Sequence, residues 1–158
     1  MTETITYLEL TDPAELREPS RPAEADHTYR EVTDPAINRS LYEEIGGPHK
    51  WIDRLRWSDD QWAAWAAGVE TWVVEVDDEV AGYFELRVDR DSTLISIFGI
   101  RVPYRGKGLG AALLTQAIKR GFELTPRVWV STNTMDAEHA LANYEARGMR
   151  VFRRQELA

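Results

Sequence analysis

Two periods of hydrophobic positions follow one another along the chain, one typical of strands and the other of helices. Alternating or β-branched runs predict strands at residues 5–11, 71–76, 80–88, 93–102, 127–131 and 149–153. Spacings of three and four predict helices at residues 35–45, 58–67 and 137–147, and another from residue 108 onward. A short turn at residues 89–91 indicates a hairpin, so the order of elements predicts a mixed α+β fold with an antiparallel meander.

Two of the predicted helices carry clear end signals. Pro35 suits the first turn of a helix, and Gly46-Gly47 is expected to end that same helix. Ser58 and Gln61 form a capping-box pattern at the start of the next helix.

Composition narrows the class of protein. The 158 residues suit a single domain spanning residues 1–158, and the absence of cysteine excludes disulfides, thiolate metal sites and cysteine nucleophiles. The formal net charge of −8 argues against nucleic acid and membrane surfaces as partners and favours a cationic substrate such as an amine. Solubility alone also explains such a charge. Three scattered histidines without ligand spacing predict no metal site.

The sequence contains no targeting or membrane signal that we can identify. Its first residues lack the basic start and apolar run of a signal peptide, and no apolar stretch approaches the roughly 20 residues that span a bilayer. We therefore expect a cytoplasmic protein.

The stretch of residues 102–110, VPYRGKGLG, is the most informative for function. It places three glycines within five residues, between an apolar strand and an amphipathic helix. Glycine permits a positive φ and a close approach of a ligand to the backbone, and the free N–H groups of a helix's first turn attract an anion. Arg105 and Lys107 add positive charge at this point of an acidic chain. The pattern predicts a binding site for a pyrophosphate.

Two common phosphate-binding patterns do not fit this loop. GxxxxGK[ST] is missing, and GxGxxG within a βαβ unit is missing too. Arg105, Gly108 and Gly110 instead give R-x-x-G-x-G, which resembles the pyrophosphate-binding motif of the GNAT superfamily of N-acetyltransferases. Residues 140–149, ALANYEARGM, resemble the closing A-x-x-x-Y-x-x-x-G-[FM] motif of this family. The order of elements also matches, so the resemblance covers nearly the whole chain.

The resemblance implies both a fold and a reaction. The GNAT fold has a central, mostly antiparallel mixed sheet of six to seven strands, splayed near acetyl-CoA, with helices on both faces. The implied reaction is an acyl transfer from acetyl-CoA straight to a primary amine, without a covalent enzyme intermediate. The segments LYEEIGGPHKWIDRLRWSDDQW, GYFEL and FGI further resemble a bacterial GNAT subgroup without an assigned substrate. Dimers are common in the family, which leaves a homodimer open.

Site residues carry over from the family motifs. The resemblance assigns acetyl-CoA binding to Ile100, Val102, Arg105, Gly106, Lys107, Gly108, Leu109, Gly110 and Asn133. Backbone groups of Ile100 and Val102, at the end of the strand before the loop, would hold the pantetheine and polarise the thioester carbonyl. Tyr144 is the candidate general acid, because the family places this hydroxyl near the sulfur of CoA. The alternative for Tyr144 is a core tyrosine that closes the last helix.

Glu85 is the candidate general base, directly or through water. It lies mid-strand, where the family often has an acidic base; the alternative is a surface carboxylate paired with Arg87. Many family members have Asn seven residues before the tyrosine, whereas this chain has Ala137, so Asn133 or Asp136 is expected to supply that contact. His139 is a further candidate, although a lone helix histidine is more often a surface residue.

Five tryptophans gather within 22 positions, at residues 51, 57, 62, 65 and 72. The family uses this region to wall the acceptor site. The i, i+3 spacing of Trp62 and Trp65 favours core packing, and we expect one or two of the five to line the pocket.

Three functions remain open at this level. The first is acetylation of a small-molecule amine, and the second is acylation of a protein or peptide amine. The third is a non-catalytic acyl-CoA-binding sensor. Tyr144 and Glu85 favour catalysis, and the sequence does not reveal the acceptor.

Overall fold

A computed structural model describes residues 3–49, 51–134 and 138–157. The elements, in chain order, are β1 (Glu3–Leu10), β2 (Thr28–Val32), α1 (Pro35–His49), α2 (Asp59–Ala67), β3 (Glu70–Val76), β4 (Glu79–Asp89), β5 (Ser92–Ile100), α3 (Leu109–Leu124), β6 (Arg127–Asn133), α4 (Glu138–Ala146) and β7 (Arg150–Leu157). The strands form one sheet in the order β2-β3-β4-β5-β6-β1-β7. Among the strand pairs that the structure describes, only β5–β6 is parallel. The predicted mixed, mostly antiparallel sheet is confirmed.

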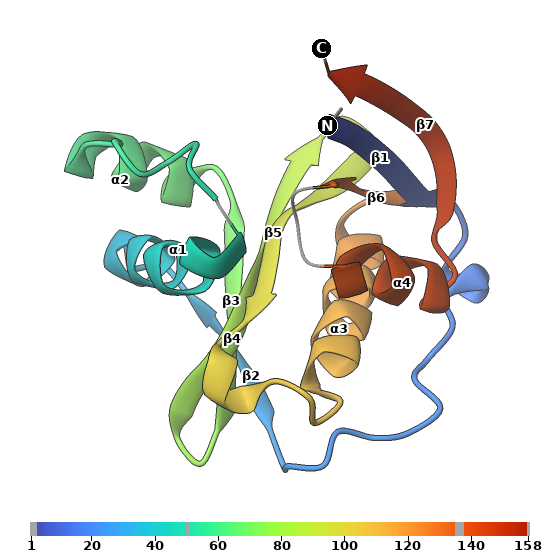
Figure 1. Cartoon of the computed structure of the whole chain (residues 1–158), viewed down its shortest axis with the longest axis horizontal. Coiled ribbons are helices and arrows are strands. Elements are labelled where there is room, and N and C mark those ends of the chain that lie inside the picture. Colours follow the sequence, from blue (N-terminus) through green and yellow to red (C-terminus); the bar gives the residue numbers. More distant parts are fainter. Residues whose placement is uncertain (1–2, 50, 135–137, 158) are drawn as a thin grey trace.

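The helices cover both faces of the sheet (Figure 1). On one face, α3 and α4 bury the larger core, which includes Leu113, Ile118 and Met149. On the other face, α1 packs Leu41 and Ile45 against the β2–β4 half of the sheet. This division matches the helical stripes of the sequence, because each stripe supplies one buried face.

Strand β2 is an element that the sequence analysis missed. It has only five residues at the edge of the sheet, and its burial is confined mainly to Val32. It pairs with β3, and Arg30 binds Glu75 across the pair at 2.9 Å. A short, exposed edge strand leaves too little alternation to be recognised.

The expected end of α1 at Gly46-Gly47 is wrong, since the helix continues to His49. Gly46 is buried where Trp51 folds back onto the helix, and a Cβ there would come within 2.7 Å of the Trp51 Cβ. This glycine therefore serves close packing within the helix and does not terminate it. The capping box of Ser58 and Gln61 at α2 is confirmed.

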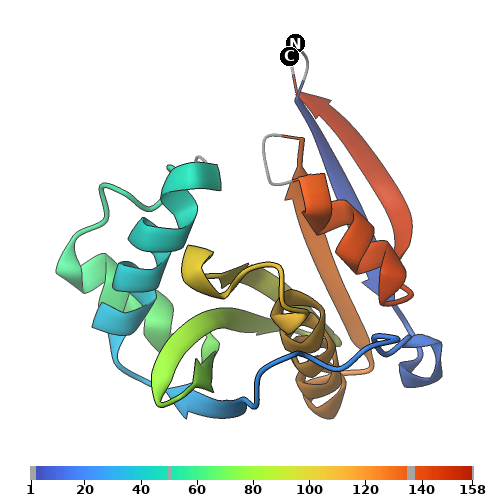
Figure 2. The ribbon, with the colours of Figure 1, turned by 60° about the horizontal axis from the view of Figure 1, so that its bottom comes forward.

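The sheet opens between β5 and β6. These strands pair only where residues 92–94 meet residues 127–129, while the rest of β5 continues along β4. Figure 2 shows the two halves of the sheet diverging like the arms of a V. The predicted strand at 93–102 ends two residues early, at Ile100, because Val102 begins a 3₁₀ turn, Val102–Tyr104. The predicted splay is thus present, and it exposes the far end of β5.

Candidate active site

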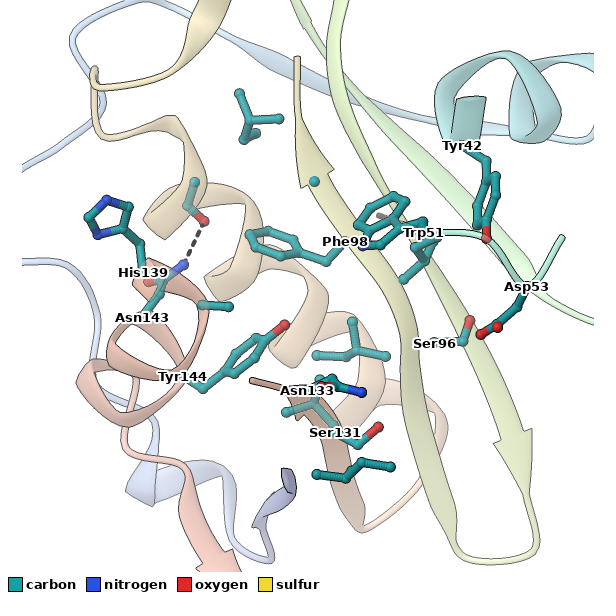
Figure 3. Close-up of a pocket in the computed structure, with 18 of the residues that line it drawn as sticks. Tyr42, Trp51, Asp53, Ser96, Phe98, Ser131, Asn133, His139, Asn143 and Tyr144 are labelled. Carbon is teal, nitrogen blue, oxygen red and sulfur yellow. Dashed lines mark hydrogen bonds between the residues drawn. The ribbon is translucent and has the colours of Figure 1, made fainter. Parts of the chain in front are cut away.

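A pocket of about 1170 Å³ occupies the opening between β5 and β6. Its walls come from both strands, from α4, from the glycine loop before α3 and from the segment after α1 (Figure 3). Residues 95–98 run along its centre, and on that side β5 has no strand partner in the described part of the chain. Backbone groups of β5 are therefore available to a ligand lying in the opening.

The glycine loop has the geometry that its sequence predicts. Gly106 and Gly108 both have φ of +79°, the left-handed region that glycine adopts without a steric penalty. Gly108 is the N-cap of the 16-residue helix α3 and provides no side-chain cap for the first N–H groups. Gly110, in that first turn, lines the pocket. The N-terminus of α3 thus offers N–H groups and its positive dipole end at one end of the opening.

Only part of the predicted acetyl-CoA set lines this pocket. Ile100, Arg105, Gly106, Gly110 and Asn133 do so. The other predicted members, Val102, Lys107, Gly108 and Leu109, are absent from its lining.

These four residues lie at the surface, in the core or in the turn of the loop itself. The side chain of Val102 is 58% exposed, and Leu109 is buried in the core. Lys107 accepts a hydrogen bond from the backbone N–H of Glu24 through its carbonyl at 3.0 Å. Lys107 and Gly108 therefore shape the loop, and their contact with a ligand stays a prediction.

Tyr144 reaches the pocket from α4. Its side chain is buried, with its ring centroid 6.5 Å from that of Phe98 on β5. Figure 3 shows its hydroxyl pointing into the space between α4 and β5. This is the position that a proton donor to a ligand in the opening requires, and the catalytic role itself stays a prediction.

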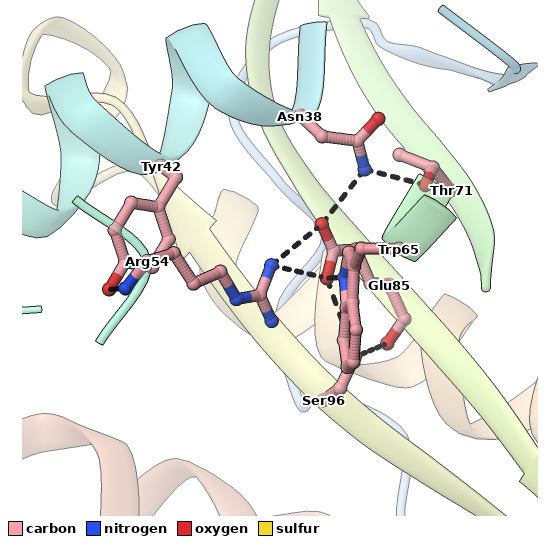
Figure 4. Close-up of polar contacts among 7 residues, drawn as sticks. All are labelled: Asn38, Tyr42, Arg54, Trp65, Thr71, Glu85 and Ser96. Carbon is pink, nitrogen blue, oxygen red and sulfur yellow. Dashed lines mark hydrogen bonds and ion pairs between the residues drawn. The ribbon is translucent and has the colours of Figure 1, made fainter. Parts of the chain in front are cut away.

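Glu85 is fully buried on β4 and does not line the pocket. It accepts hydrogen bonds from Asn38 Nδ2 at 2.8 Å, Trp65 Nε1 at 2.8 Å and Arg54 Nη1 at 2.9 Å (Figure 4). Ser96, which does line the pocket, has its hydroxyl 3.5 Å from the same carboxylate. The alternative partner Arg87 is not the one found, since Arg54 forms the ion pair. A role for Glu85 as base stays a prediction that requires a relay through water or Ser96.

Arg54 is held in an aromatic cage made of Tyr42, Trp57, Trp62 and Trp65. The centre of its guanidinium lies 4.4 Å from the centroid of Trp65 and 5.3 Å from those of Tyr42 and Trp57. Trp62 is 2% exposed and packs against Tyr42 and Trp57, as core packing requires, and Trp51 lines the pocket. Arg54 itself lines the pocket although its side chain is only 9% exposed.

A match to a protein-family model shows to which family the chain belongs. The model of the acetyltransferase (GNAT) family matches residues 38–149, which is more than half of the chain. The chain belongs to the GNAT family. Its domain is therefore that of an acyltransferase, and members of the family generally use acetyl-CoA as cosubstrate.

Solved structures agree with the GNAT fold. A GCN5-related N-acetyltransferase from Sphaerobacter thermophilus superposes with a TM-score of 0.72 at 19% identity, over 97% of this chain and 50% of that one. Another from Kribbella flavida gives 0.64 at 19% identity, over 95% and 56%. An acetyltransferase from Bacillus subtilis in complex with CoA gives 0.62 at 20% identity, over 79% and 77%. A comparison with curated proteins found no match. The chain spans between half and two thirds of the first matched structures, and at these identities the likeness shows the fold alone.

The GNAT pocket contains further side chains that sequence reasoning did not assign. Asn143, one residue before Tyr144, donates from Nδ2 to the Gly110 carbonyl at 3.4 Å and so links α4 to the glycine loop. Arg54 comes from the segment after α1 and is 31 positions from its partner Glu85. No motif marks such a distant pair. The position of Asn143 beside the motif tyrosine was a usable signal.

Of the other positions that the sequence analysis considered for the site, two line the pocket and two lie outside the described residues. Asn133 lines the pocket at the end of β6 and donates from Nδ2 to Glu3 at 3.3 Å, and His139 lines it from α4. Asp136 and Ala137 lie outside the described residues. Within the described ranges, no group of three or more acidic or histidine side chains is placed to hold a metal ion. Nor does any described helix have the length and apolar character to cross a bilayer.

Proposed function

We propose that the protein transfers an acetyl group from acetyl-CoA to the primary amine of a small molecule by direct attack. The observation that carries the proposal is a single pocket that joins three features. These are the glycine loop at the N-terminus of α3, the unpaired edge of β5 beside Tyr144, and a polar end formed by Asp53 and Arg54.

The loop end of the pocket suits the pyrophosphate of acetyl-CoA. Gly106 has open space where a Cβ would stand, and Gly110 has only Ile100 at 3.9 Å. Phosphate oxygens can therefore approach the N–H groups of the first turn of α3. Arg105, whose Nε donates to the Ile100 carbonyl at 3.1 Å, brings a positive charge to the same end.

The middle of the pocket suits the acyl transfer. The acetyl thioester supplies the electrophilic carbon. N–H groups on the free edge of β5 would stabilise charge on the carbonyl oxygen while the new C–N bond forms and the C–S bond breaks. The Tyr144 hydroxyl would give its proton to the departing sulfur. The proton of the attacking amine would leave through water or Ser96 toward Glu85.

The acceptor end of the pocket favours a small molecule. Trp51 and Ile52 wall it on the side of α1, and Phe98 stands on β5. A volume of about 1170 Å³ exceeds the roughly 300–1,000 Å³ of typical small-molecule sites, which leaves room for a pantetheine arm together with a small amine. We place the reaction in the cytoplasm because a chain without cysteine suits a reducing compartment.

Calorimetric titration with acetyl-CoA tests the cosubstrate site. Gly110→Glu places a carboxylate in the first turn of α3, where it favours the helix but repels a pyrophosphate. Gly110→Gln is the matched uncharged control. We expect micromolar binding by the wild type, and binding by the Glu variant at least about tenfold weaker than by the Gln variant. Loss of binding in both variants would still place the cosubstrate at this loop. Wild-type affinity in both would place it elsewhere.

Thiol release with a panel of amines tests the reaction itself. The proposal expects release of CoA that depends on an added small amine. An acetyl-CoA-binding protein that releases no thiol with any amine would be a sensor and not an enzyme.

A further inference from the structure

Arg54 offers a hydrogen-bonding edge that the protein does not use. A guanidinium carries five N–H donors in one plane. Within the described chain, the side chain of Arg54 donates only through Nη1, to both oxygens of Glu85 at 2.9 and 3.3 Å. Nε and Nη2 donate to no described group, and Figure 4 shows them without partners. Neither atom is among the buried polar atoms sealed away from solvent.

The surroundings fix the direction of this free edge. Trp65 stacks on the guanidinium at 4.4 Å, and Trp57 and Tyr42 each lie 5.3 Å from its centre. Glu85 occupies the edge at Nη1. The pair of N–H groups on Nε and Nη2 therefore remains for a partner in the pocket that Arg54 lines. That pair is the fork that binds a carboxylate through two parallel hydrogen bonds.

We propose that Arg54 binds a carboxylate of the acceptor, so that the acceptor is an amine of the amino-acid class. The inference rests on the proposed acetyl transfer and names its substrate class. Glu85 acts here as a positioning residue, because its ion pair holds the guanidinium in place. The N–H donors that remain on Nε and Nη2 belong to a charged group, and hydrogen bonds from a charged donor to a carboxylate are stronger than those between neutral groups.

The neighbouring groups fit such a molecule. Asp53 also lines the pocket, and its exposed carboxylate supplies the opposite charge for the acceptor's amine. Figure 3 shows Asp53 and Ser96 on the α1 side of the pocket, across from Tyr144. Trp51 and Ile52 provide apolar surface, and the side chain of Ile52 is 68% exposed. An amino acid with an apolar or aromatic side chain matches all three features.

The first test compares three acceptors that share one side chain. L-Phenylalanine keeps the carboxylate, L-phenylalaninamide has a neutral amide in its place, and 2-phenylethylamine lacks the group. We expect kcat/KM for thiol release to be about ten- to hundredfold higher with phenylalanine, the usual effect of losing a hydrogen-bonded charge. The amine of phenylalaninamide loses its proton more readily than that of phenylalanine. This difference alone would favour the amide as acceptor, so it cannot produce the expected preference for phenylalanine. L-Leucine, leucinamide and 3-methylbutylamine form a second such series.

A double variant tests whether Arg54 causes the preference. Arg54→Gln alone would leave Glu85 buried without its cation, so Glu85→Gln is combined with it. The measured quantity is the ratio of kcat/KM for phenylalanine over phenylalaninamide, compared with the same ratio in Glu85→Gln alone, so that the loss of the Glu85 carboxylate is common to both variants. We expect this ratio to fall to about one, with acetyl-CoA binding by calorimetry showing that the variant is folded. A ratio that stays at the wild-type value would overturn the assignment.

A measurement on the wild type alone keeps the inference testable if the double variant does not fold. 3-Phenylpropanoate has the carboxylate but no amine, and 3-phenylpropanamide is its neutral counterpart. We expect the acid to compete with the acceptor at least about tenfold better than the amide. Equal inhibition, or equal turnover of acid, amide and plain amine, would refute the carboxylate site while leaving acetyl transfer intact. Absence of thiol release with every amine would instead refute the proposed function, and this inference with it.

Discussion

Tyr144 shows how a single side chain can be tested for chemistry apart from packing. Its ring packs near Phe98 and its hydroxyl faces the pocket, so removing the oxygen alone preserves the packing. We expect Tyr144→Phe to lower kcat by about a hundredfold, the lower end of general acid–base effects, because the departing thiolate loses its proton donor. The affinity for acetyl-CoA should change less than about threefold. Steady-state thiol release and calorimetry give the two values, and an unchanged kcat would contradict the role.

Arg54 and Glu85 form a buried pair whose stability contribution can be separated from that of exposed pairs. Their side chains are 9% and 0% exposed. Arg54→Gln alone should lower the free energy of unfolding by about 3–5 kcal/mol, since it leaves a buried carboxylate without its cation. Adding Glu85→Gln should restore part of that loss. The matched control is the exposed pair Arg39–Asp59, where Arg39→Gln should cost at most about 1 kcal/mol. Urea denaturation measures the wild type, Arg54→Gln, Glu85→Gln, their double variant and Arg39→Gln. Additive effects of the two single variants Arg54→Gln and Glu85→Gln would disprove the coupling.

At the scale of residues, the sequence predicts those functional residues that lie within a recognisable motif. The glycine loop and Tyr144 were found because each sits inside a spaced pattern, and both line or shape the pocket. Arg54 was missed because its meaning depends on Glu85 and on the tryptophans around it, which meet only in the folded chain. Glu85 was found by its strand position, but its burial depends on the register of β4 and cannot be read from its neighbours in sequence.

At the scale of elements, replacing each of the two adjacent glycines of α1 by alanine should have opposite effects on stability. A Cβ on Gly46 would lie 2.7 Å from Trp51, whereas one on Gly47 would meet nothing within 4 Å. Gly46→Ala should therefore destabilise the protein by about 1–3 kcal/mol through overpacking. Gly47→Ala should stabilise it by roughly 0.5–1 kcal/mol, because alanine suits a helix better than glycine. Thermal unfolding of both variants gives the signs, and equal signs would show that the Trp51 contact is wrong.

The glycine pair also explains why helix ends are harder to predict than helices. Glycine stops many helices, yet it equally permits a close side-chain approach, and the two uses look alike in sequence. All strands except β2 were predicted, because each has alternation or β-branched residues over several positions. The edge position of β2 is a property of the sheet, which local pattern does not contain.

Helix α3 is tied to strand β3 by an ion pair that gives stability a pH dependence. Arg120 Nε lies 2.5 Å from Glu70, and hydrogen bonding to Arg120 lowers the pKa of Glu70 below its ordinary 4.5. A lowered pKa contributes stability above 4.5 that is lost as the pH falls through the folded value. Glu70→Gln should thus cost about 1 kcal/mol at pH 7 and progressively less below pH 4.5. Urea unfolding at several pH values checks this, and a cost that is constant with pH would exclude the pair as the cause.

At the scale of the whole molecule, the sheet consists of two halves that diverge and leave a pocket between them. The β2–β5 half and the β6-β1-β7 half pair only at residues 92–94 with 127–129, and the pocket lies in the gap beyond. A ligand that contacts both halves supplies interactions that the sheet itself lacks there. Only the family resemblance implied this opening. The alternation of side chains along β5 is the same whether or not β6 pairs with its whole length, so it does not reveal where the pairing ends.

Acetyl-CoA should therefore protect the two sides of the opening together. At about 100 times its dissociation constant, a ligand that binds only the folded state adds roughly 2.7 kcal/mol to stability, so the melting temperature should rise. Hydrogen exchange should slow in the first turn of α3 and at those amides of residues 95–100 that face the opening, because they have no strand or helix partner. The β1–β7 pairing should change little. Gly110→Glu at the same acetyl-CoA concentration should weaken both effects, since a tenfold loss of affinity leaves only about 1.4 kcal/mol of the added stability. Protection confined to α3 would mean that the ligand stops at the loop, and the acyl group would then not reach Tyr144.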